Sequence, residues 1–409
     1  MIVPRWLARR GRFLGRFDGR LWALVASQLV TSAGFSIALP FLSLYLHRDR
    51  DLSMTVVGAI MLANAVVSAA GRMAGGELAD RLGRRPTVLG AAGVRVLLFL
   101  VLAALIRGTG PVWAIAAVYL GVRITGALAM TAISAMVADL APGGQRMEAY
   151  GLLRVGGNVG WAAGPALGGY LAAFLPYWTL FAVTALASSV AFFLLAAFAR
   201  ESHARGEREP VLGALREVLA HRRFLAFVGL SLLVFLVAGQ LVSTLSVYTV
   251  ERLGLSEAKF GALLTLNGLL VVFLQYPVAR GVDRLRRGRA LVLGSLLYGV
   301  GYLAFGWLRA FPGLLGAIAV VTLGEIVFAP STLTVTAELA PPAHRGRYMG
   351  AFGLAETMGW SAGPFLGGVL LDAFPTSPLL LWGTITALAF LAALGFKLWG
   401  KQTRPDLAA

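Results

Sequence analysis

The chain has 409 residues, of which 58% are hydrophobic and only 13% are charged, and its mean hydropathy is +0.77. A soluble domain carries about 25% charged residues, so most of this surface must face lipid rather than water. The chain has no cysteine, which excludes disulfides, thiol catalysis and thiolate metal sites, and its four histidines lie outside the apolar runs. We therefore expect no metal ion and no cofactor.

Twelve apolar segments follow one another along the chain, each with the roughly 20 residues needed to cross a bilayer. They cover 21–46, 54–79, 86–106, 111–139, 147–175, 177–199, 223–250, 257–280, 288–308, 313–338, 346–372 and 376–397. Most of the 36 Lys and Arg residues fall in the termini and in alternate connections. The positive-inside rule then predicts an integral inner-membrane protein with both termini in the cytoplasm. The net charge of +17 follows from this topology and from attraction to membrane lipids, so nucleic acid is not an expected partner.

The predicted class is therefore an all-α membrane protein with two six-helix bundles. Its expected parts are a cytoplasmic N-terminal segment (1–20), a first bundle (21–199), a cytoplasmic linker (200–222), a second bundle (223–397) and a cytoplasmic tail (398–409). Within the linker, the sequence favours an amphipathic helix from Val211 to Ala220.

The two halves repeat one another. Asp139-Leu140-Ala141-Pro142 returns half a chain later as Glu338-Leu339-Ala340-Pro341, and Asn64 returns as Asn267. Similar halves in a membrane place a binding site between them, and rocking of the halves about that site moves a solute across. The repeat thus indicates a transporter.

The connection after the second span reads Gly76-Glu77-Leu78-Ala79-Asp80-Arg81-Leu82-Gly83-Arg84-Arg85-Pro86, with a partial copy around Asp283. This string resembles the signature loop of the major facilitator superfamily, and the resemblance extends over essentially the whole chain. It implies that Asp80 lies against span eleven near Gly350, that Asp283 faces span five, and that Arg84 and Arg287 pair with Asp139 and Glu338. The implied gate residues are Gly76, Asp80, Arg81, Gly83, Arg84, Asp139, Asp283, Arg284, Arg287 and Glu338. The alternative is a determinant of folding and topology without a gating role.

Span five carries a glycine-proline motif made of Gly160, Gly164, Pro165, Gly168 and Gly169, and span eleven repeats it with Gly363 and Pro364. Proline kinks a membrane helix, and glycines admit a close neighbour. The motif resembles the antiporter motif of proton-coupled exporters in the same family, which implies export. Ordinary small-residue packing is the alternative.

Ionisable residues at membrane depth are costly and usually functional. Glu325 in span ten is our first candidate for the proton-coupling acid, and Glu356 in span eleven is the second. Arg123 resembles the fourth-helix arginine that the family uses in proton transfer, whereas Arg95 is expected to snorkel or to pair within its half. A static buried salt bridge is the alternative for Glu325. Many drug/proton antiporters of the family that this chain resembles carry an acid in the first helix, whereas the first span here contains none. Either coupling therefore resides on Glu325 or Glu356, or transport is not proton-driven.

The expected substrate cavity is rich in aromatic and aliphatic residues, which suits lipophilic or amphipathic compounds better than sugars. Beside the coupling residues, its candidates are Gln28, Phe35, Asn64, Arg154, Asn158, Gln240, Tyr248, Asn267, Gln275 and Phe328.

Together these features favour a secondary transporter that exports lipophilic or amphipathic small molecules, in exchange for protons, by alternating access, and the family resemblance implies that it is a monomer. A flippase for lipids or lipid-linked glycans, with Arg123 and Arg154 on an anionic headgroup, is one alternative, and an uptake symporter for a small metabolite is another. An enzyme is not expected, because the chain lacks a Ser-His-Asp set, a metal-ligand cluster and a nucleotide-binding loop.

Overall fold

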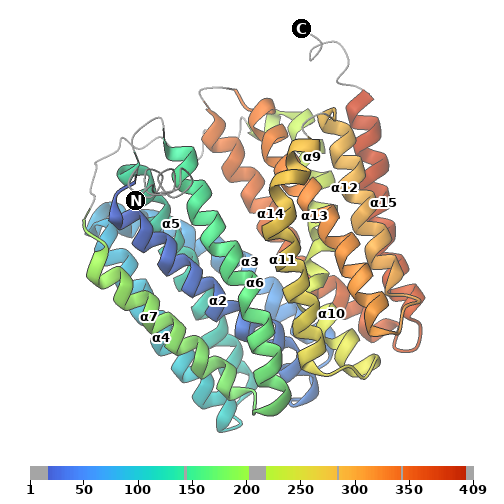
Figure 1. Cartoon of the computed structure of the whole chain (residues 1–409), viewed down its shortest axis with the longest axis horizontal. Coiled ribbons are helices and arrows are strands. Elements are labelled where there is room, and N and C mark those ends of the chain that lie inside the picture. Colours follow the sequence, from blue (N-terminus) through green and yellow to red (C-terminus); the bar gives the residue numbers. More distant parts are fainter. Residues whose placement is uncertain (1–16, 142–144, 202–217, 283–284, 342–343, 402–409) are drawn as a thin grey trace, which may run out of the picture. The chain divides into compact units, whose positions relative to one another are not determined.

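The computed structural model describes residues 17–141, 145–201, 218–282, 285–341 and 344–401, and within these ranges it is helical without a strand. The long helices (Figure 1) are α2 (Gly19–Arg48), α3 (Met54–Leu82), α4 (Arg84–Arg107), α5 (Val112–Leu140), α6 (Arg146–Phe174), α7 (Trp178–Phe198), α9 (Arg222–Ala238), α11 (Glu257–Val282), α12 (Arg287–Ala304), α13 (Phe311–Leu339), α14 (Arg345–Ala373) and α15 (Pro378–Lys401). An apolar medium demands helices, because each backbone polar group must find its partner inside its own segment. Nine helical stretches of the described residues are long and apolar enough to span a membrane. The predicted class of all-α membrane protein is confirmed.

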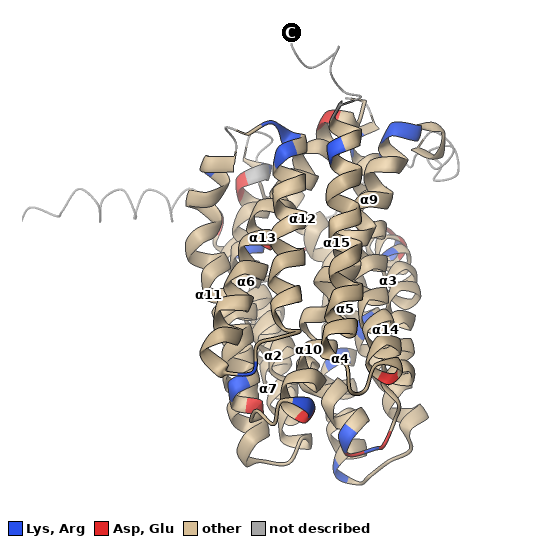
Figure 2. Ribbon diagram, turned by 90° about the vertical axis from the view of Figure 1, so that its right-hand side faces the viewer, with Lys and Arg blue, Asp and Glu red and all other residues tan. Residues whose placement is uncertain are grey.

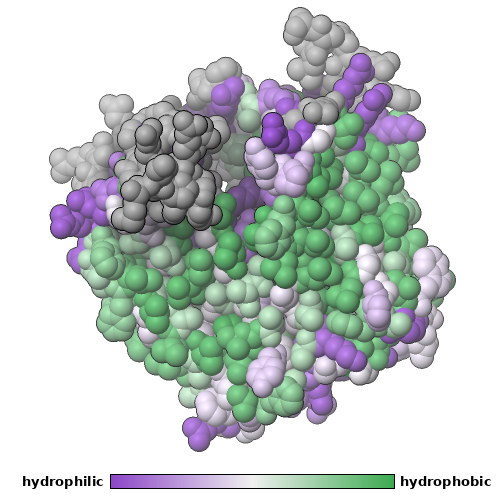
Figure 3. Space-filling view, viewed as in Figure 1, coloured by the Kyte–Doolittle hydropathy of each residue, from purple (hydrophilic) through white to green (hydrophobic). Residues whose placement is uncertain are grey.

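Most charged residues lie toward the helix ends, and a few lie between them (Figure 2). In the space-filling view, apolar side chains cover the middle of the visible surface and hydrophilic ones lie toward its two edges (Figure 3). Many large apolar side chains are exposed in consequence, among them Val66, Met73, Trp113, Phe193 and Phe273. This distribution is what a lipid-facing surface requires.

The described chain separates into two compact units. The first contains residues up to Ala38, Val67–Gly164 and Pro176–Gly206, and the second contains Leu39–Val66, Pro165–Leu175 and the chain from Glu207 onward. In the second unit, therefore, the last part of α2, the first part of α3 and the last part of α6 pack with helices of the second half of the sequence. The predicted domain boundaries stay predictions.

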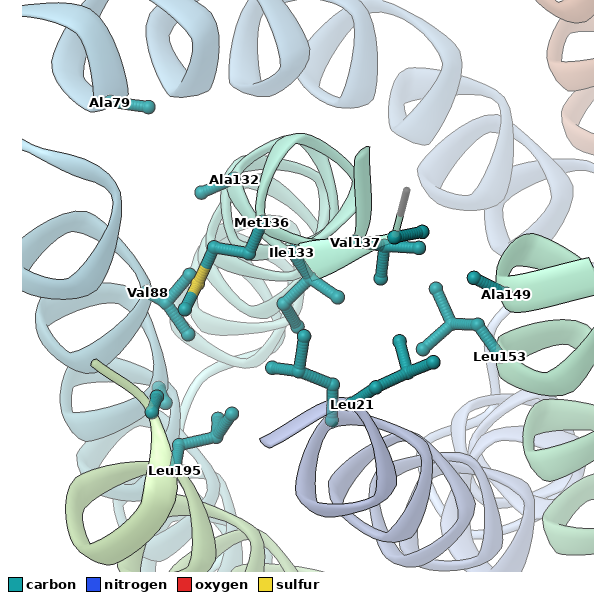
Figure 4. Close-up of a cluster of buried hydrophobic side chains, with 14 of the residues drawn as sticks. Leu21, Ala79, Val88, Ala132, Ile133, Met136, Val137, Ala149, Leu153 and Leu195 are labelled. Atoms are coloured by element: carbon teal, nitrogen blue, oxygen red, sulfur yellow. The ribbon is translucent and has the colours of Figure 1, made fainter. Parts of the chain in front are cut away.

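All six helices of the first half meet in one core of the first unit (Figure 4). Leu21 of α2, Val88 of α4 and Met136 of α5 are almost fully buried there. Small side chains such as Ala79 and Ala149 let α3 and α6 approach the same cluster. Shape complementarity between small and large residues holds membrane helices together where the hydrophobic effect cannot.

The seventh predicted span, 223–250, is not one continuous helix. α9 ends at Ala238 and is followed by the short segments η1 (Gly239–Leu241), α10 (Thr244–Val247) and the π-helical η2 (Tyr248–Arg252). π-helical turns of this kind occur frequently at functional sites.

Close packing against α14 accompanies the break. A side-chain carbon on Gly239 would lie 3.2 Å from the Cα of Gly363 and 3.3 Å from Pro364, so the two backbones nearly touch. The Gln240 amide donates hydrogen bonds to the carbonyl oxygens of Leu236 (2.8 Å) and Gly363 (2.9 Å). These side-chain bonds compensate for backbone bonds that the interrupted helix does not make.

Some predicted features lie outside the described residues. They include the start of the chain up to residue 16, most of the linker with its expected helix from Val211, and the gate residues Asp283 and Arg284.

Candidate functional site

The two ion pairs implied by the repeated loop are present. Arg84, at the start of α4, pairs with Asp139 at the end of α5, and its Nη1 also donates to the Ala135 carbonyl oxygen at 2.8 Å. In the second half, Arg287 Nε lies 3.4 Å from Glu338 Oε1. Each pair joins the beginning of one helix to the end of the next. Their part in gating stays a prediction.

Gly83 and Glu201 shape the turn between α3 and α4. Gly83 has a φ of 101°, a region that favours glycine. A Cβ there would lie 2.7 Å from the carboxylate of Glu201. That carboxylate accepts hydrogen bonds from the backbone N–H groups of Arg84 (2.9 Å) and Arg85 (3.3 Å), and thereby caps α4. The second copy has Arg286 at the corresponding place with a φ of −59°, so it needs no glycine.

The other gate residues of the first half lie along the last turns of α3. Arg81 Nη2 is 2.5 Å from the Glu77 carboxylate one turn earlier, and Gly76 precedes this pair. Asp80 is exposed and has interactions of its own. Its predicted contact with span eleven would join the two units, and it stays a prediction.

The glycine-proline motif provides close helix contacts in both halves. A Cβ on Gly164 would lie 2.5 Å from the Ala33 carbonyl oxygen of α2, and one on Gly169 would lie 2.9 Å from the Cα of Gly261. Gly160 packs on α2 in the same way, and Gly168, Pro165 and Pro364 are buried. In α14, a Cβ on Gly363 would lie 2.7 Å from the Leu236 carbonyl oxygen. The motif thus fixes backbone approach, while the direction of transport stays a prediction.

Glu325 lies halfway along α13 in a network of hydrogen bonds. Asn267 Nδ2, on α11, donates to Glu325 Oε2 at 3.0 Å and lies 3.0 Å from Thr322 Oγ1. The Thr322 hydroxyl in turn donates to the Ile318 carbonyl oxygen at 2.7 Å. Asn267 and Thr322 are buried, whereas Glu325 is half-buried. An acid in this position is oriented by its neighbours and still reachable.

The second candidate acid lies in the same region of the second unit. Glu325 and Glu356 are both within electrostatic range of the buried Tyr298 on α12. Glu356 is half-buried on α14 and also has partners. Both acids proposed for proton coupling therefore lie on the side of the second unit that faces Tyr298 of α12.

In the first unit, Arg123 of α5 lies over the ring of Phe35 on α2, with its guanidinium carbon 4.9 Å from the ring centre. Gln28 Nε2 donates to Ser32 Oγ at 3.2 Å on the same helix. All four side chains are only half-buried. Arg123 and Glu325 belong to different units, and their meeting in one cavity stays a prediction.

The remaining cavity candidates have diverse surroundings. Asn64 Nδ2 donates to Ser361 Oγ at 2.9 Å in a buried contact that joins α3 to α14. The Tyr248 hydroxyl is buried and donates to the Phe305 carbonyl oxygen at 2.7 Å. Phe328 is packed in an aromatic cluster, and Gln240 stabilises the break after α9.

Three candidates are more open. Gln275 Nε2 donates to the Ile326 carbonyl oxygen at 3.3 Å, Asn158 is half-buried and Arg154 is exposed.

Of the two expectations for Arg95, pairing within its half agrees with the structure and snorkelling does not. The side chain is only 8% exposed, its Nη2 donates to Thr31 Oγ1 at 3.3 Å, and it forms no ion pair among the described residues. The reason is that Arg95 faces α2 rather than lipid, so its neighbours enclose it.

Sequence reasoning missed a polar cluster at the end of the second unit where α2 leads into α3. The Asp372 carboxylate of α14 accepts hydrogen bonds from the backbone N–H groups of Met54 (3.1 Å) and Thr55 (2.7 Å), which begin α3, and from the Thr55 hydroxyl (2.7 Å). An acid beside the first N–H groups of a helix is a favourable cap.

An ion pair and a histidine–carboxylate contact complete this end cluster. Arg48 Nη1 lies 3.0 Å from Glu257 Oε1, and His47 Nε2 lies 3.3 Å from Glu251 Oε2. Nearby, burial raises the pKa of the Asp49 carboxyl, with Arg48 lowering it and Glu257 raising it further. The end cluster joins first-half helices to second-half helices by charged contacts.

Comparison with known proteins agrees with this architecture. The sequence profile of the Major Facilitator Superfamily matches residues 24–324 and 251–407. An uncharacterized MFS-type transporter of Bacillus subtilis, YttB, is 27% identical over 365 residues, which cover 88% of this chain and 90% of YttB. Multidrug resistance protein MdtH of Photorhabdus laumondii is 25% identical over 395 residues, covering 94% and 95%.

Solved structures share the fold. A peptide transporter POT superposes with a TM-score of 0.79 over 93% of this chain and 94% of that one, at 18% sequence identity. At this identity the likeness concerns the fold alone. The family profile spans nearly the whole chain, and the helices, the repeat and the loop motif agree with it. The chain therefore belongs to the major facilitator superfamily of transporters.

Proposed function

We propose that this transporter exports lipophilic or amphipathic small molecules in exchange for protons, with Glu325 carrying the proton. The observation on which this rests is the position of Glu325, 14 residues or about 21 Å from the start of α13, inside the Asn267–Thr322 network. Placing an ionisable side chain at this depth in a membrane costs free energy, and residues of this kind are usually functional. Its half-buried state leaves it within reach of water and substrate.

The hydrogen bond from Asn267 suits a carboxylate as acceptor, so the ionised acid has a defined position before a proton arrives. Protonation removes the charge and weakens that bond, because a neutral acceptor binds a donor less strongly than a carboxylate does. Proton binding is thereby coupled to the contact between α11 and α13. Alternating access then converts this local change into exposure of the site to the other side.

The proposed substrate class and the proposed direction of transport rest on different observations. The half-buried Phe35 and Arg123 offer an aromatic and cationic surface rather than a sugar-binding cluster. Export is favoured by the glycine-proline motif of α6 and by the likeness to a protein named for multidrug resistance. We further propose that the protein acts as a monomer in the inner membrane, with both termini cytoplasmic.

The test uses liposomes that contain the purified protein and a pH-sensitive dye. A proton gradient is imposed, and lipophilic cations, anions, neutral drugs and labelled lipids are added in turn. Glu325→Gln should abolish the substrate-dependent proton flux, and Glu148→Gln, an acid at the start of α6, should retain it. Undiminished flux in Glu325→Gln would transfer the role to Glu356. Movement of labelled lipid without proton flux would replace the proposal with lipid flipping.

A further inference from the structure

Arg95 is a buried cation whose hydrogen-bonding capacity is largely unused. It lies on α4, is 8% exposed, and makes one hydrogen bond, from Nη2 to Thr31 Oγ1 at 3.3 Å. Its Nε is buried and has no partner in the described structure. A guanidinium carries five N–H donors and remains charged in proteins. The proposed export mechanism does not use this group.

No acid of the first unit is placed to neutralise Arg95. Helices α2, α4 and α7 contain no Asp or Glu. The nearest acids along neighbouring helices, such as Asp139 and Glu77, lie at the end of the unit where α4 begins with Arg84. Arg95 is eleven residues beyond Arg84, which is about 16 Å along the helix axis. Arg95 is therefore a membrane-embedded charge that has no counter-ion within its unit.

Arg95 and a second arginine, Arg123, contact the same face of α2. Its partner Thr31 lies one helical turn before Phe35, and the guanidinium of Arg123 lies 4.9 Å from the Phe35 ring centre. Residues four apart on a helix have Cβ atoms about 5–6 Å apart on the same side. Two cationic groups from α4 and α5 therefore approach the same strip of α2, which we call the Thr31 face.

The Thr31 face is polar and partly open. Thr31, Ser32 and Phe35 are half-buried rather than sealed. One turn before Ser32, Gln28 adds an amide, and opposite it on α6 stands Gly157, which has no side chain to fill the space. An entering group would thus meet hydroxyl, amide and guanidinium donors beside an aromatic ring.

We propose that the Thr31 face binds the oxyanion head of an amphipathic substrate, a carboxylate, phosphate or sulfonate. Arg95 and the Thr31 hydroxyl donate hydrogen bonds to the anion, Arg123 adds a second positive charge, and the Phe35 ring packs on the apolar part next to the head. Such an anion satisfies the buried donors of Arg95 and balances its charge, which an apolar medium otherwise penalises strongly. The inference rests on the proposed export function and narrows its substrate class to amphipathic anions.

The experiment measures binding of radiolabelled dodecanoate to the protein in nanodiscs of phosphatidylcholine, with dodecanamide as the neutral counterpart. Arg95→Gln should weaken dodecanoate binding about tenfold or more, because hydrogen bonds to a charged group are worth about 1.5–3 kcal/mol and 1.4 kcal/mol is tenfold. It should leave dodecanamide binding within about twofold. Arg95→Lys should restore most of the preference for the anion. Arg107→Gln, an exposed arginine at the end of the same helix, should bind as the wild type does.

A second arm separates a free substrate from a lipid headgroup. If phosphatidylglycerol in the nanodisc displaces dodecanoate from the wild type but not from Arg107→Gln, the arginine at position 95 is not the site and the proposal fails. Equal displacement from both proteins identifies a lipid phosphate as the ligand, and no displacement identifies a free amphiphile; both outcomes retain the site.

Thermal unfolding distinguishes a ligand-binding role of Arg95 from a purely structural one. Arg95→Gln should melt at or above the wild-type temperature, since it removes a buried charge without an ion partner. Dodecanoate should raise the melting temperature of the wild type and of Arg107→Gln but not that of Arg95→Gln. Unchanged dodecanoate binding in Arg95→Gln, or a melting temperature far below wild type, would overturn the proposal. Export itself is judged separately, because it is tested by the proton flux of Glu325→Gln in liposomes, whereas the Thr31 face is tested by dodecanoate binding to Arg95→Gln.

Discussion

Asp372→Ala should shift the second unit toward a state in which α3 separates from α14. The Asp372 carboxylate receives three hydrogen bonds from Met54 and Thr55 at the beginning of α3, of 3.1, 2.7 and 2.7 Å. Because Asp372 is exposed, its hydrogen bonds contribute the free energy of an ordinary helix cap, about 1 kcal/mol, and not that of a buried charge. Loss of about 1 kcal/mol should raise the ratio of open to closed molecules about fivefold.

The absence of cysteine makes a distance measurement direct, because two introduced cysteines are the only labelling sites. Spin labels at the exposed positions Val56 and Leu379 report the separation of α3 from α15 within this unit. Double electron–electron resonance should show a larger long-distance population in Asp372→Ala. Asp372→Glu, which keeps the charge, should recover part of the short-distance population.

Asp18→Ala is the matched control. Asp18 also caps a helix, since its Oδ1 accepts a hydrogen bond from the Arg20 N–H at 2.8 Å, but this cap lies inside the first unit and joins no second helix. Asp18→Ala should leave the distance distribution unchanged. An unchanged distribution in Asp372→Ala, or an equal shift in both variants, would refute the reasoning.

Three further changes test the packing described above. Gly83→Ala should destabilise the protein by about 1–3 kcal/mol, because it places a side chain at a φ of 101° and against Glu201, whereas Arg286→Ala should be neutral; thermal unfolding of both variants checks this. Tyr248→Phe should cost about 1 kcal/mol, because it removes the 2.7 Å hydrogen bond to the Phe305 carbonyl oxygen and leaves that oxygen only the longer one from Arg309 at 3.4 Å; an unaltered denaturation midpoint would contradict it. Gly363→Ala should push α14 away from α9, which a lowered melting temperature and increased protease cleavage near residue 239 would reveal.

The features that could be predicted from the sequence are those set by short patterns or by the repeat. Hydropathy located the helices because a spanning helix needs a continuous apolar run. The ion pairs Arg84–Asp139 and Arg287–Glu338 were implied by the resemblance to the family's signature loop, and the repeat supplies both partners at corresponding positions. Gly83 was expected as part of the loop motif, and its φ of 101° gives a structural reason for a glycine at that place.

The features that could not be predicted depend on residues far apart in the chain. Nothing near Asp372 indicates that it caps a helix more than 300 residues earlier, and Glu201 lies in a polar connection that resembles ordinary linker sequence. The break at Gly239 follows from contact with α14, not from any polar residue pattern. Snorkelling and pairing of Arg95 could not be told apart from the sequence, because sequence does not tell which side of a helix faces lipid.

The buried bond from Asn64 to Ser361 shows that the two halves are no longer interchangeable. Asn64 has its counterpart in Asn267, but the repeat aligns Ser361 with Ala162, and an alanine side chain accepts no hydrogen bond. The hydrogen bond is worth about 1 kcal/mol, so the contact between α3 and α14 within the second unit is stabilised by a polar side chain that its counterpart in the repeat lacks. A single serine, present in one copy of the repeat and replaced by alanine in the other, thus makes the two copies chemically unequal.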